Sequence, residues 1–214
     1  MKSVLRLESF CLAVVLGWAL SARPARADLG LELLEPPGIY SAFIDVTYNA
    51  TTDLFNASGF ALTLDDDGIG PAFNITGGTF DITATIDASG AFSGGSLAIG
   101  GTVSALGFNS GTLLSGDLQA LGTPTSGSDP FEFIFDVTGG DASSIFGSIP
   151  LGVILSGGTG YNGTFAADFD NLSLEVRGTG TAFSDTAGVI PLPASGWLAL
   201  CGLGLVTAGR RIGR

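Results

Sequence analysis

Apolar and polar residues alternate along much of the chain between residues 28 and 187. In one run, Phe80, Ile82, Ala84 and Ile86 would face one side of a strand, and the aspartates and threonines between them the other. Gly, Asn and Asp clusters separate such runs about every eight to twelve residues, as in all-β sandwiches and barrels. The pattern predicts an all-β fold, a single antiparallel β-sandwich or barrel-like domain, with strands that include residues 39–48, 54–64, 80–86, 131–137 and 172–176.

Residues 89–122 differ because glycine recurs every few residues. We expect short strands joined by tight turns there, since glycine adopts positive φ angles without strain. A solenoid is the alternative, but no fixed period is sustained. Further along the chain we expect a polar loop at 121–130 that divides two sheets of a sandwich, and a short helix within 139–147 with Asp141 as its N-cap. Residues 178–188 indicate a flexible lead into the C-terminal tail.

The first 27 residues have the features of a secretory signal peptide. Lys2 and Arg6 precede an apolar run over residues 10–20, which is too short to span a membrane by itself. Ala25-Arg26-Ala27 follows as a small-x-small cleavage site. We therefore expect export through the Sec machinery and a mature chain that begins at Asp28.

The C-terminal end has the features of a membrane helix. Residues 192–209 carry no charge, and about 18 residues in a helix would measure about 27 Å, close to the hydrocarbon thickness of a bilayer. Three arginines follow, at positions 210, 211 and 214. Because basic residues stay on the cytoplasmic side, the body of the protein would be held outside the inner membrane.

The tail as a whole resembles a known sorting signal. A short proline motif precedes the apolar segment, and the basic end closes the chain; the motif is Ile190-Pro191-Leu192-Pro193-Ala194 and the basic residues are Arg210, Arg211 and Arg214. This order is similar to the VPLPA variant of the PEP-CTERM signal of Gram-negative bacteria. Ile at 190 in place of the usual Val and the interrupted arginine run are mild departures.

The resemblance implies a partner and a destination. In that family an exosortase, a membrane transpeptidase, recognises the tail and removes it near the proline motif, and members usually accompany exopolysaccharide production. The chain would then comprise a signal peptide (1–27), an exported β domain (28–187) and a sorting tail (188–214). A plain C-terminal membrane anchor is the alternative reading of the tail.

Charge excludes one class of partner. Seven of the eight basic residues lie in the two terminal segments, whereas 19 of the 20 acidic residues lie in residues 28–187, which gives that part a formal charge of −18. Binding to nucleic acid or to anionic lipid depends on Lys and Arg contacts to phosphate. We therefore expect no nucleic-acid partner for the exported domain.

The residue types in the exported part limit its chemistry. The chain has no histidine, and its two cysteines, Cys11 and Cys201, fall in the terminal segments. Ser-His, Cys-His and histidine-ligated zinc sites are thereby excluded from residues 28–187. A pair of carboxylates, as in glycoside hydrolases, is the remaining enzymatic possibility. No pair stands out among the 19, and we expect a protein that is not an enzyme.

One acidic turn is a candidate metal site. Asp65 and Asp67 lie two residues apart and are followed by Gly68, as at the start of a calcium-binding loop. Calcium takes six to eight oxygen ligands, and no Glu follows at the EF-hand distance, so other loops would have to complete the site. A hairpin turn without a metal is the alternative, and no other cofactor is expected.

Sugar binding would require aromatic side chains on the surface. Both tryptophans, Trp18 and Trp197, lie in the terminal segments, so a platform would have to use Tyr40, Tyr48, Tyr161 or a phenylalanine. Most phenylalanines fall at alternating positions typical of a core. Five Asn-x-Ser/Thr sequences indicate turns that face solvent; they begin at Asn49, Asn56, Asn74, Asn162 and Asn171.

These features give three hypotheses of function. The first is a non-catalytic protein of the cell surface or extracellular matrix, sorted by an exosortase and associated with exopolysaccharide. The second is a binding module that depends on glycan or calcium. The third is a glycoside hydrolase that uses two carboxylates.

Overall fold

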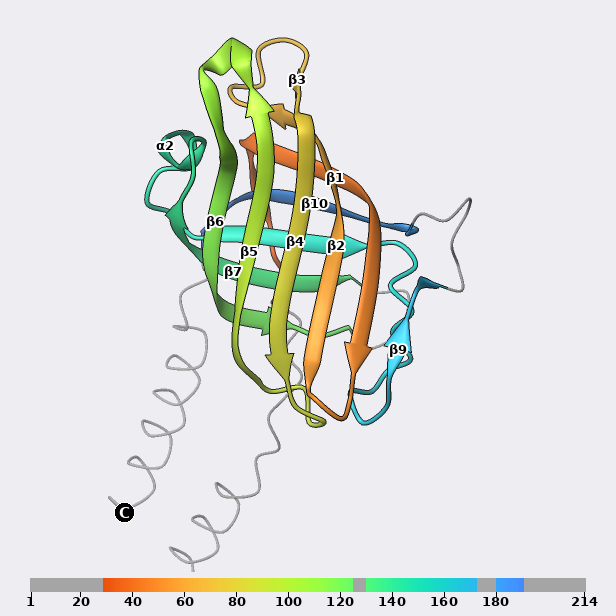
Figure 1. Ribbon diagram of the computed structural model, residues 1–214. Coiled ribbons are helices and arrows are strands. Elements are labelled where there is room, and N and C mark those ends of the chain that lie inside the picture. Colours follow the sequence, from red (N-terminus) through yellow and green to blue (C-terminus); the bar gives the residue numbers. More distant parts are fainter. Residues whose placement is uncertain (1–28, 125–129, 173–179, 191–214) are drawn as a thin grey trace, which may run out of the picture.

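The computed structural model describes residues 29–124, 130–172 and 180–190, and these form a single antiparallel sheet (Figure 1). Its strands are β1 (Leu33–Asn49), β2 (Leu54–Asp65), β3 (Phe73–Asn74), β4 (Thr76–Ile86), β5 (Phe92–Val103), β6 (Phe108–Gly122), β7 (Phe131–Gly139), β8 (Leu151–Ser156), β9 (Phe169–Asp170) and β10 (Ala182–Val189). The prediction of an all-β domain is confirmed.

The sheet closes on itself through its first strand. β1 pairs with β2 along one edge and with β10 along the other, so eight strands form a barrel: β1, β2, β4, β5, β6, β7, β8 and β10. Each of these strands pairs with the next along the chain, and β3 and β9 are two-residue additions. The solenoid alternative is wrong because the first and last strands pair directly.

Alternating residues fill the interior, as the pattern predicts. Phe80, Ile82 and Ile86 are fully buried, and the threonines at 83 and 85 are exposed. Phe131, Phe133 and Phe135 on β7 are likewise fully buried. Each aromatic side chain removes about 150–250 Å² from water, so these rings supply much of the hydrophobic stabilisation.

The connection between β8 and β10 adds three further rings to this core. Tyr161, Phe165 and Phe169 are all buried. The ring of Tyr161 lies 5.1 Å from that of Phe131, in an edge-to-face arrangement, and Phe165 lies 5.0 Å from Tyr48. This segment therefore packs its aromatic side chains against those of the barrel strands.

Asn171 corrects the expectation that all five Asn-x-Ser/Thr sequences face solvent. Its side chain is fully buried. Its Nδ2 donates to the carbonyl of Ile44 at 2.9 Å, and its Oδ1 accepts from the N–H of Val46 at 2.8 Å. Its own N–H donates to the carbonyl of Val46 at 3.1 Å. Asn171 thus provides hydrogen-bond partners for backbone groups of β1. These groups lie between the part of β1 that pairs with β10 and the part that pairs with β9.

The glycine-rich middle forms two long strands rather than several short ones. β5 and β6 have 12 and 15 residues and pair over most of their length. Gly101 and Gly111 lie opposite each other with φ angles of 119° and 89°, beside irregularities in the register. Glycine therefore serves here to bend paired strands, because a side chain would disfavour these φ angles.

Three smaller predictions are also corrected. The helix α2 (Ser143–Phe146) begins after Ala142, and Asp141 instead accepts a hydrogen bond of 2.8 Å from the N–H of Ser110. The expected flexible lead at 178–188 is wrong over residues 182–188, which belong to β10. The 121–130 connection divides no pair of sheets, because β6 and β7 are neighbours in one sheet. Residues 173–176 of the expected strand at 172–176 lie outside the described residues.

Candidate functional site

The last strand ends at the start of the predicted sorting motif. Val189 pairs with Leu33 of β1, and its N–H donates to the carbonyl of Pro150 at 2.9 Å. Ile190 follows outside the strand, with 68% of its surface exposed. The other motif residues, Pro191, Leu192, Pro193 and Ala194, lie outside the described residues, as do Arg210, Arg211 and Arg214.

Both ends of the described chain meet at one groove. It has a volume of about 460 Å³, and residues 29–32 and Leu34 line one part of it. Ile134 of β7, Val189 and Ile190 line the rest. The predicted signal-peptide cleavage site, Ala25, Ala27 and Asp28, is outside the described residues, but Asp28 is bonded to the first of them. The described residues that come next in the chain to the two predicted processing sites, Leu29 and Ile190, therefore line the same groove.

Glu132 lies beneath the chain segment at this groove. The N–H groups of Leu29 and Gly30 donate to its Oε2 at 2.6 and 2.9 Å, and that of Leu31 donates to its Oε1 at 3.0 Å. The side chain is 7% exposed. Alternation correctly places Glu132 outside the core, but it gives no sign of the segment that covers it. No motif in the sequence marks Glu132 as a functional residue.

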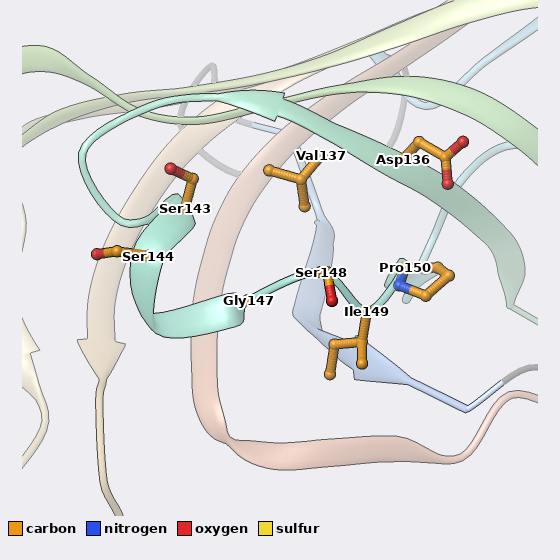
Figure 2. A pocket seen from close by; sticks show the side chains of 8 residues that line it. All are labelled: Asp136, Val137, Ser143, Ser144, Gly147, Ser148, Ile149 and Pro150. Atoms are coloured by element: carbon orange, nitrogen blue, oxygen red, sulfur yellow. The ribbon is translucent and has the colours of Figure 1, made fainter.

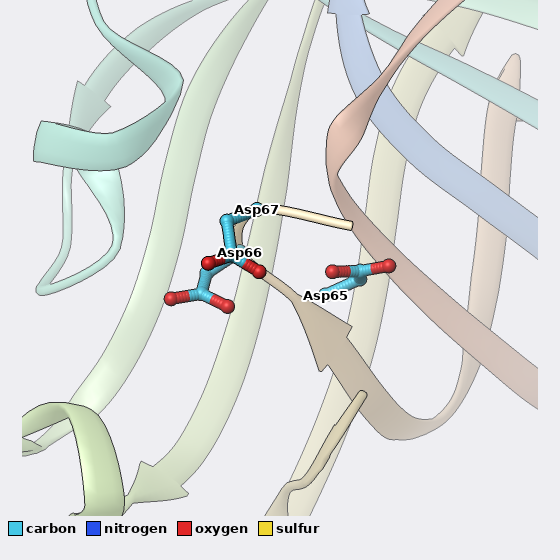
Figure 3. Close-up of side chains that lie close together, drawn as sticks. All are labelled: Asp65, Asp66 and Asp67. Atoms are coloured by element: carbon cyan, nitrogen blue, oxygen red, sulfur yellow. The ribbon is translucent and has the colours of Figure 1, made fainter. Parts of the chain in front are cut away.

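The acidic turn after β2 brings its carboxylates together (Figure 3). One oxygen each from Asp65, Asp66 and Asp67 lie within 4.8 Å of one another. Asp65 Oδ1 also accepts from the N–H of Gly68 at 2.8 Å, and Asp67 Oδ1 from that of Ile69 at 2.8 Å. Two of the three side chains thus stabilise the turn, as the hairpin alternative expects.

Two further carboxylates, those of Glu35 and Asp185, lie on β1 and β10. Burial raises the pKa of Glu35, at the start of β1, and the negative charges of Asp185 and Asp65 raise it further. Burial also raises the pKa of Asp185, on β10. With one ligand oxygen from each residue, the turn offers three of the six to eight oxygens that calcium takes, so water or other residues would have to supply the rest.

A shallow depression beside α2 offers no catalytic pair (Figure 2). Its volume is about 670 Å³, and Asp136 is the only titratable residue that lines it. Asp136 lies on β7, at the opposite end of the depression from Ser143 and Ser144 of α2. Glycoside hydrolysis needs two carboxyl groups about 5–9.5 Å apart, and this depression provides one.

Aromatic residues suited to a sugar platform occur on one part of the barrel surface. Tyr48 and Tyr161 are only 3% and 4% exposed, so both are wrong as platform candidates. Four other rings are exposed and lie on β1, β2 and β10; they form what we call the aromatic patch: Tyr40, Phe43, Phe60 and Phe183.

Pairing of the strands explains how the aromatic patch is assembled. Ala42 of β1 lies opposite Phe60 on one side and Phe183 on the other. Two strand spacings place these phenylalanines roughly 10 Å apart, with a small side chain between them. Phe43, next to Ala42, has a φ angle of 57° at an irregularity in the pairing, and half of its surface is exposed.

No helix among the described residues is long and apolar enough to span a membrane, and the predicted helix at 192–209 lies outside them. Comparisons of the chain with protein-family models, with curated proteins and with solved structures found no match. Function must therefore be inferred from the residues and contacts of this chain.

Proposed function

We propose that this chain is a non-catalytic, exported protein of the cell surface or extracellular matrix, associated with exopolysaccharide. The signal peptide directs it through the Sec machinery, and the C-terminal helix holds it in the inner membrane. An exosortase-type enzyme then cuts near residues 191–194 and releases or transfers the β domain.

The position of the last strand is the observation that best supports this proposal. β10 closes the barrel between β8 and β1 and ends at Val189, one residue before the motif begins. A cut anywhere after Ile190 would leave every strand of the barrel in the released part. The exposed side chain of Ile190 is also consistent with access by an enzyme.

The absence of catalysis is supported by the residues themselves. Residues 28–187 contain no His or Cys, and buried apolar side chains fill the interior of the barrel. Two carboxylates of the acidic turn, those of Asp65 and Asp67, accept hydrogen bonds from backbone N–H groups.

The test is the intact mass and location of the protein in its host. Pro191, Leu192 and Pro193 are replaced together by alanine. Thr207→Ala serves as the control, because it changes the same tail but keeps the motif and the arginines. We expect wild type and control to lose the residues after about 193 and to leave the inner membrane, whereas the triple variant stays full-length and membrane-bound. If wild type retains Arg214 and remains in the membrane, the tail is only an anchor.

The aromatic patch favours glycan binding as a second candidate function. Aromatic rings present flat apolar faces, and two of them about 10 Å apart can contact separate sugar units of one chain. Glycan binding would explain why the β domain exposes four large rings across three adjacent strands.

Titration of the purified protein with exopolysaccharide from its host tests this second function. Phe60→Ala combined with Phe183→Ala should weaken binding at least tenfold. Leu54→Ala is the matched control, because Leu54 is also about 40% exposed on β2 but lies outside the aromatic patch. Equal binding by the double variant and wild type would rule out the patch. Repeating the titration with and without calcium distinguishes direct binding from calcium-dependent binding.

A further inference from the structure

Residues 29–32, which we call the N-terminal strap, cross the outside of the barrel before β1 begins. A methyl group at Gly122 of β6 would lie 3.0 Å from Cγ of Leu29, and one at Gly152 of β8 would lie 3.4 Å from Cδ1 of Leu31. The strap therefore runs over β6 and β8, at positions where glycine leaves room for it. Glu132, on β7 between these two strands, lies under its middle.

The strap forms an anion-binding nest around Glu132. Three successive N–H groups, those of residues 29, 30 and 31, point at the two oxygens of one carboxyl group. Gly30 has a φ angle of 59°, and a left-handed residue within such a run turns successive N–H groups to the same side. With 7% of its surface exposed, Glu132 is mostly shielded from water.

A shielded carboxylate would gain from a cation, and the exported domain has almost none. The described residues include no Lys, Arg or His, and Arg177 is the only basic residue in residues 28–187. Signal-peptide removal after Ala27 would create one more cation, the α-ammonium group of Asp28. Covalent geometry keeps that nitrogen within about 4 Å of the Leu29 nitrogen, and the Leu29 nitrogen is 2.6 Å from Glu132 Oε2.

We propose that Glu132 is a binding site for the free α-ammonium group of the processed chain. This inference rests on the proposed removal of the signal peptide. Before cleavage, residue 28 carries a neutral amide, and the three N–H groups bind the strap to Glu132. After cleavage, a charge-assisted contact joins them and fixes the strap next to the β1–β10 pairing that closes the barrel. Maturation would thereby strengthen the folded domain.

The sequence makes this proposal directly testable, because no lysine follows Lys2. The α-amino group is then the only primary amine of a chain that begins at Asp28. The full-length protein, with its own signals, is produced in its host and purified, and its intact mass identifies the first residue. Reductive methylation with ¹³C-formaldehyde labels the amine, and NMR follows its titration.

In wild type we expect the pKa of the α-amino group to lie about one unit above its ordinary range of about 7.7–8.0. Glu132→Gln should return the pKa to the ordinary range. Glu32→Gln is the matched control, because it removes the same charge from an exposed side chain of the strap. The carboxyl groups of Asp28 and Glu32 remain in the Glu132→Gln protein, so the difference from wild type reports Glu132 alone.

A second variant covers the case in which Glu132→Gln does not fold. Two glycines inserted between Ala27 and Asp28 move the ammonium group about 7 Å along the chain but leave Glu132 in place. The pKa should again be ordinary. If wild type begins at Asp28 and shares its amine pKa with both variants, the ammonium site is wrong while processing stands. If the mass shows that residues 1–27 are retained, the proposed processing and the site both fail.

Discussion

The side-chain Nδ2 of Asn171 donates a hydrogen bond of 2.9 Å to the carbonyl of Ile44, 127 residues earlier in the chain. With the contact from Val46 to its Oδ1, the amide of Asn171 takes the place of a neighbouring strand beside β1. The site is fully buried, so water does not replace the amide in the folded state. The stability of the barrel should therefore depend strongly on this residue.

Replacement of Asn171 by alanine should lower the free energy of unfolding by about 2–4 kcal/mol, because it leaves one buried N–H and one buried carbonyl without a partner. Urea unfolding of the purified protein measures this change. Asn162→Ala is the control, since Asn162 is exposed and accepts a local bond from the N–H of Thr164; it should change stability by about 0.5 kcal/mol or less. Equal effects of the two variants would contradict the role of Asn171.

The central ring of Phe131 should be far more important for stability than the exposed ring of Phe60. Phe131 is fully buried and lies 5.1–6.3 Å from five other rings, measured between centroids. Phe131→Ala should cost about 3–5 kcal/mol through lost burial and the cavity left behind. Phe60→Ala should cost less than about 1 kcal/mol, because its ring is 51% exposed. The same unfolding measurements test both values.

Neutralising Glu35 should stabilise the protein at pH 7. Its pKa is raised in the folded state, which means that folding favours the protonated carboxyl group. The stability that protonated Glu35 contributes is therefore fully present below the ordinary pKa near 4.5, and it is lost as the pH rises through the pKa of the folded state. Glu35→Gln should therefore raise the unfolding free energy at pH 7, by about 1 kcal/mol or less because the site is largely solvated. The gain should vanish below about pH 4.

Asp141 provides the opposite case. The hydrogen bonds from Ser110 hold its pKa below the ordinary value, so its stabilising contribution is present above that value and disappears as pH falls through the folded one. Asp141→Asn should therefore lower stability at pH 7, where Glu35→Gln raises it. Thermal unfolding of both variants between pH 3 and 7 distinguishes the two signs. A Glu35→Gln protein that is less stable than wild type at pH 7 would contradict the raised pKa of Glu35, which burial and the charges of Asp185 and Asp65 cause.

Calcium should stabilise the protein if the acidic turn binds it. For a site with a dissociation constant near 1 mM, about 10 mM calcium would add about 1.4 kcal/mol to the unfolding free energy. Combining Asp65→Asn with Asp67→Asn should abolish this gain, while Asp117→Asn, on the exposed face of β6, should retain it. An identical calcium response in wild type and the double variant would show that the ion acts elsewhere.

The sequence determined the class of the fold and the positions of many strands, because alternation is a local property. The alternating apolar residues of 80–86, together with Phe131, Phe133 and Phe135, face the interior as predicted. It also gives the acidic character of residues 28–187 directly. The signal peptide and the sorting motif stay predictions, which rest on neighbouring residues in the sequence. The prediction was weaker in the glycine-rich middle, because glycine is compatible with both tight turns and bent strands.

Only the tertiary structure decided how the sheet closes and which polar residues are covered. The pairing of β1 with β10 makes a barrel rather than a sandwich, and it joins residues that are about 150 positions apart. Glu132 and Asn171 have ordinary sequence contexts, yet one is covered by a segment 103 residues earlier and the other is buried against β1. Contacts between distant residues leave no local periodic signal, and for that reason the sequence alone did not reveal them.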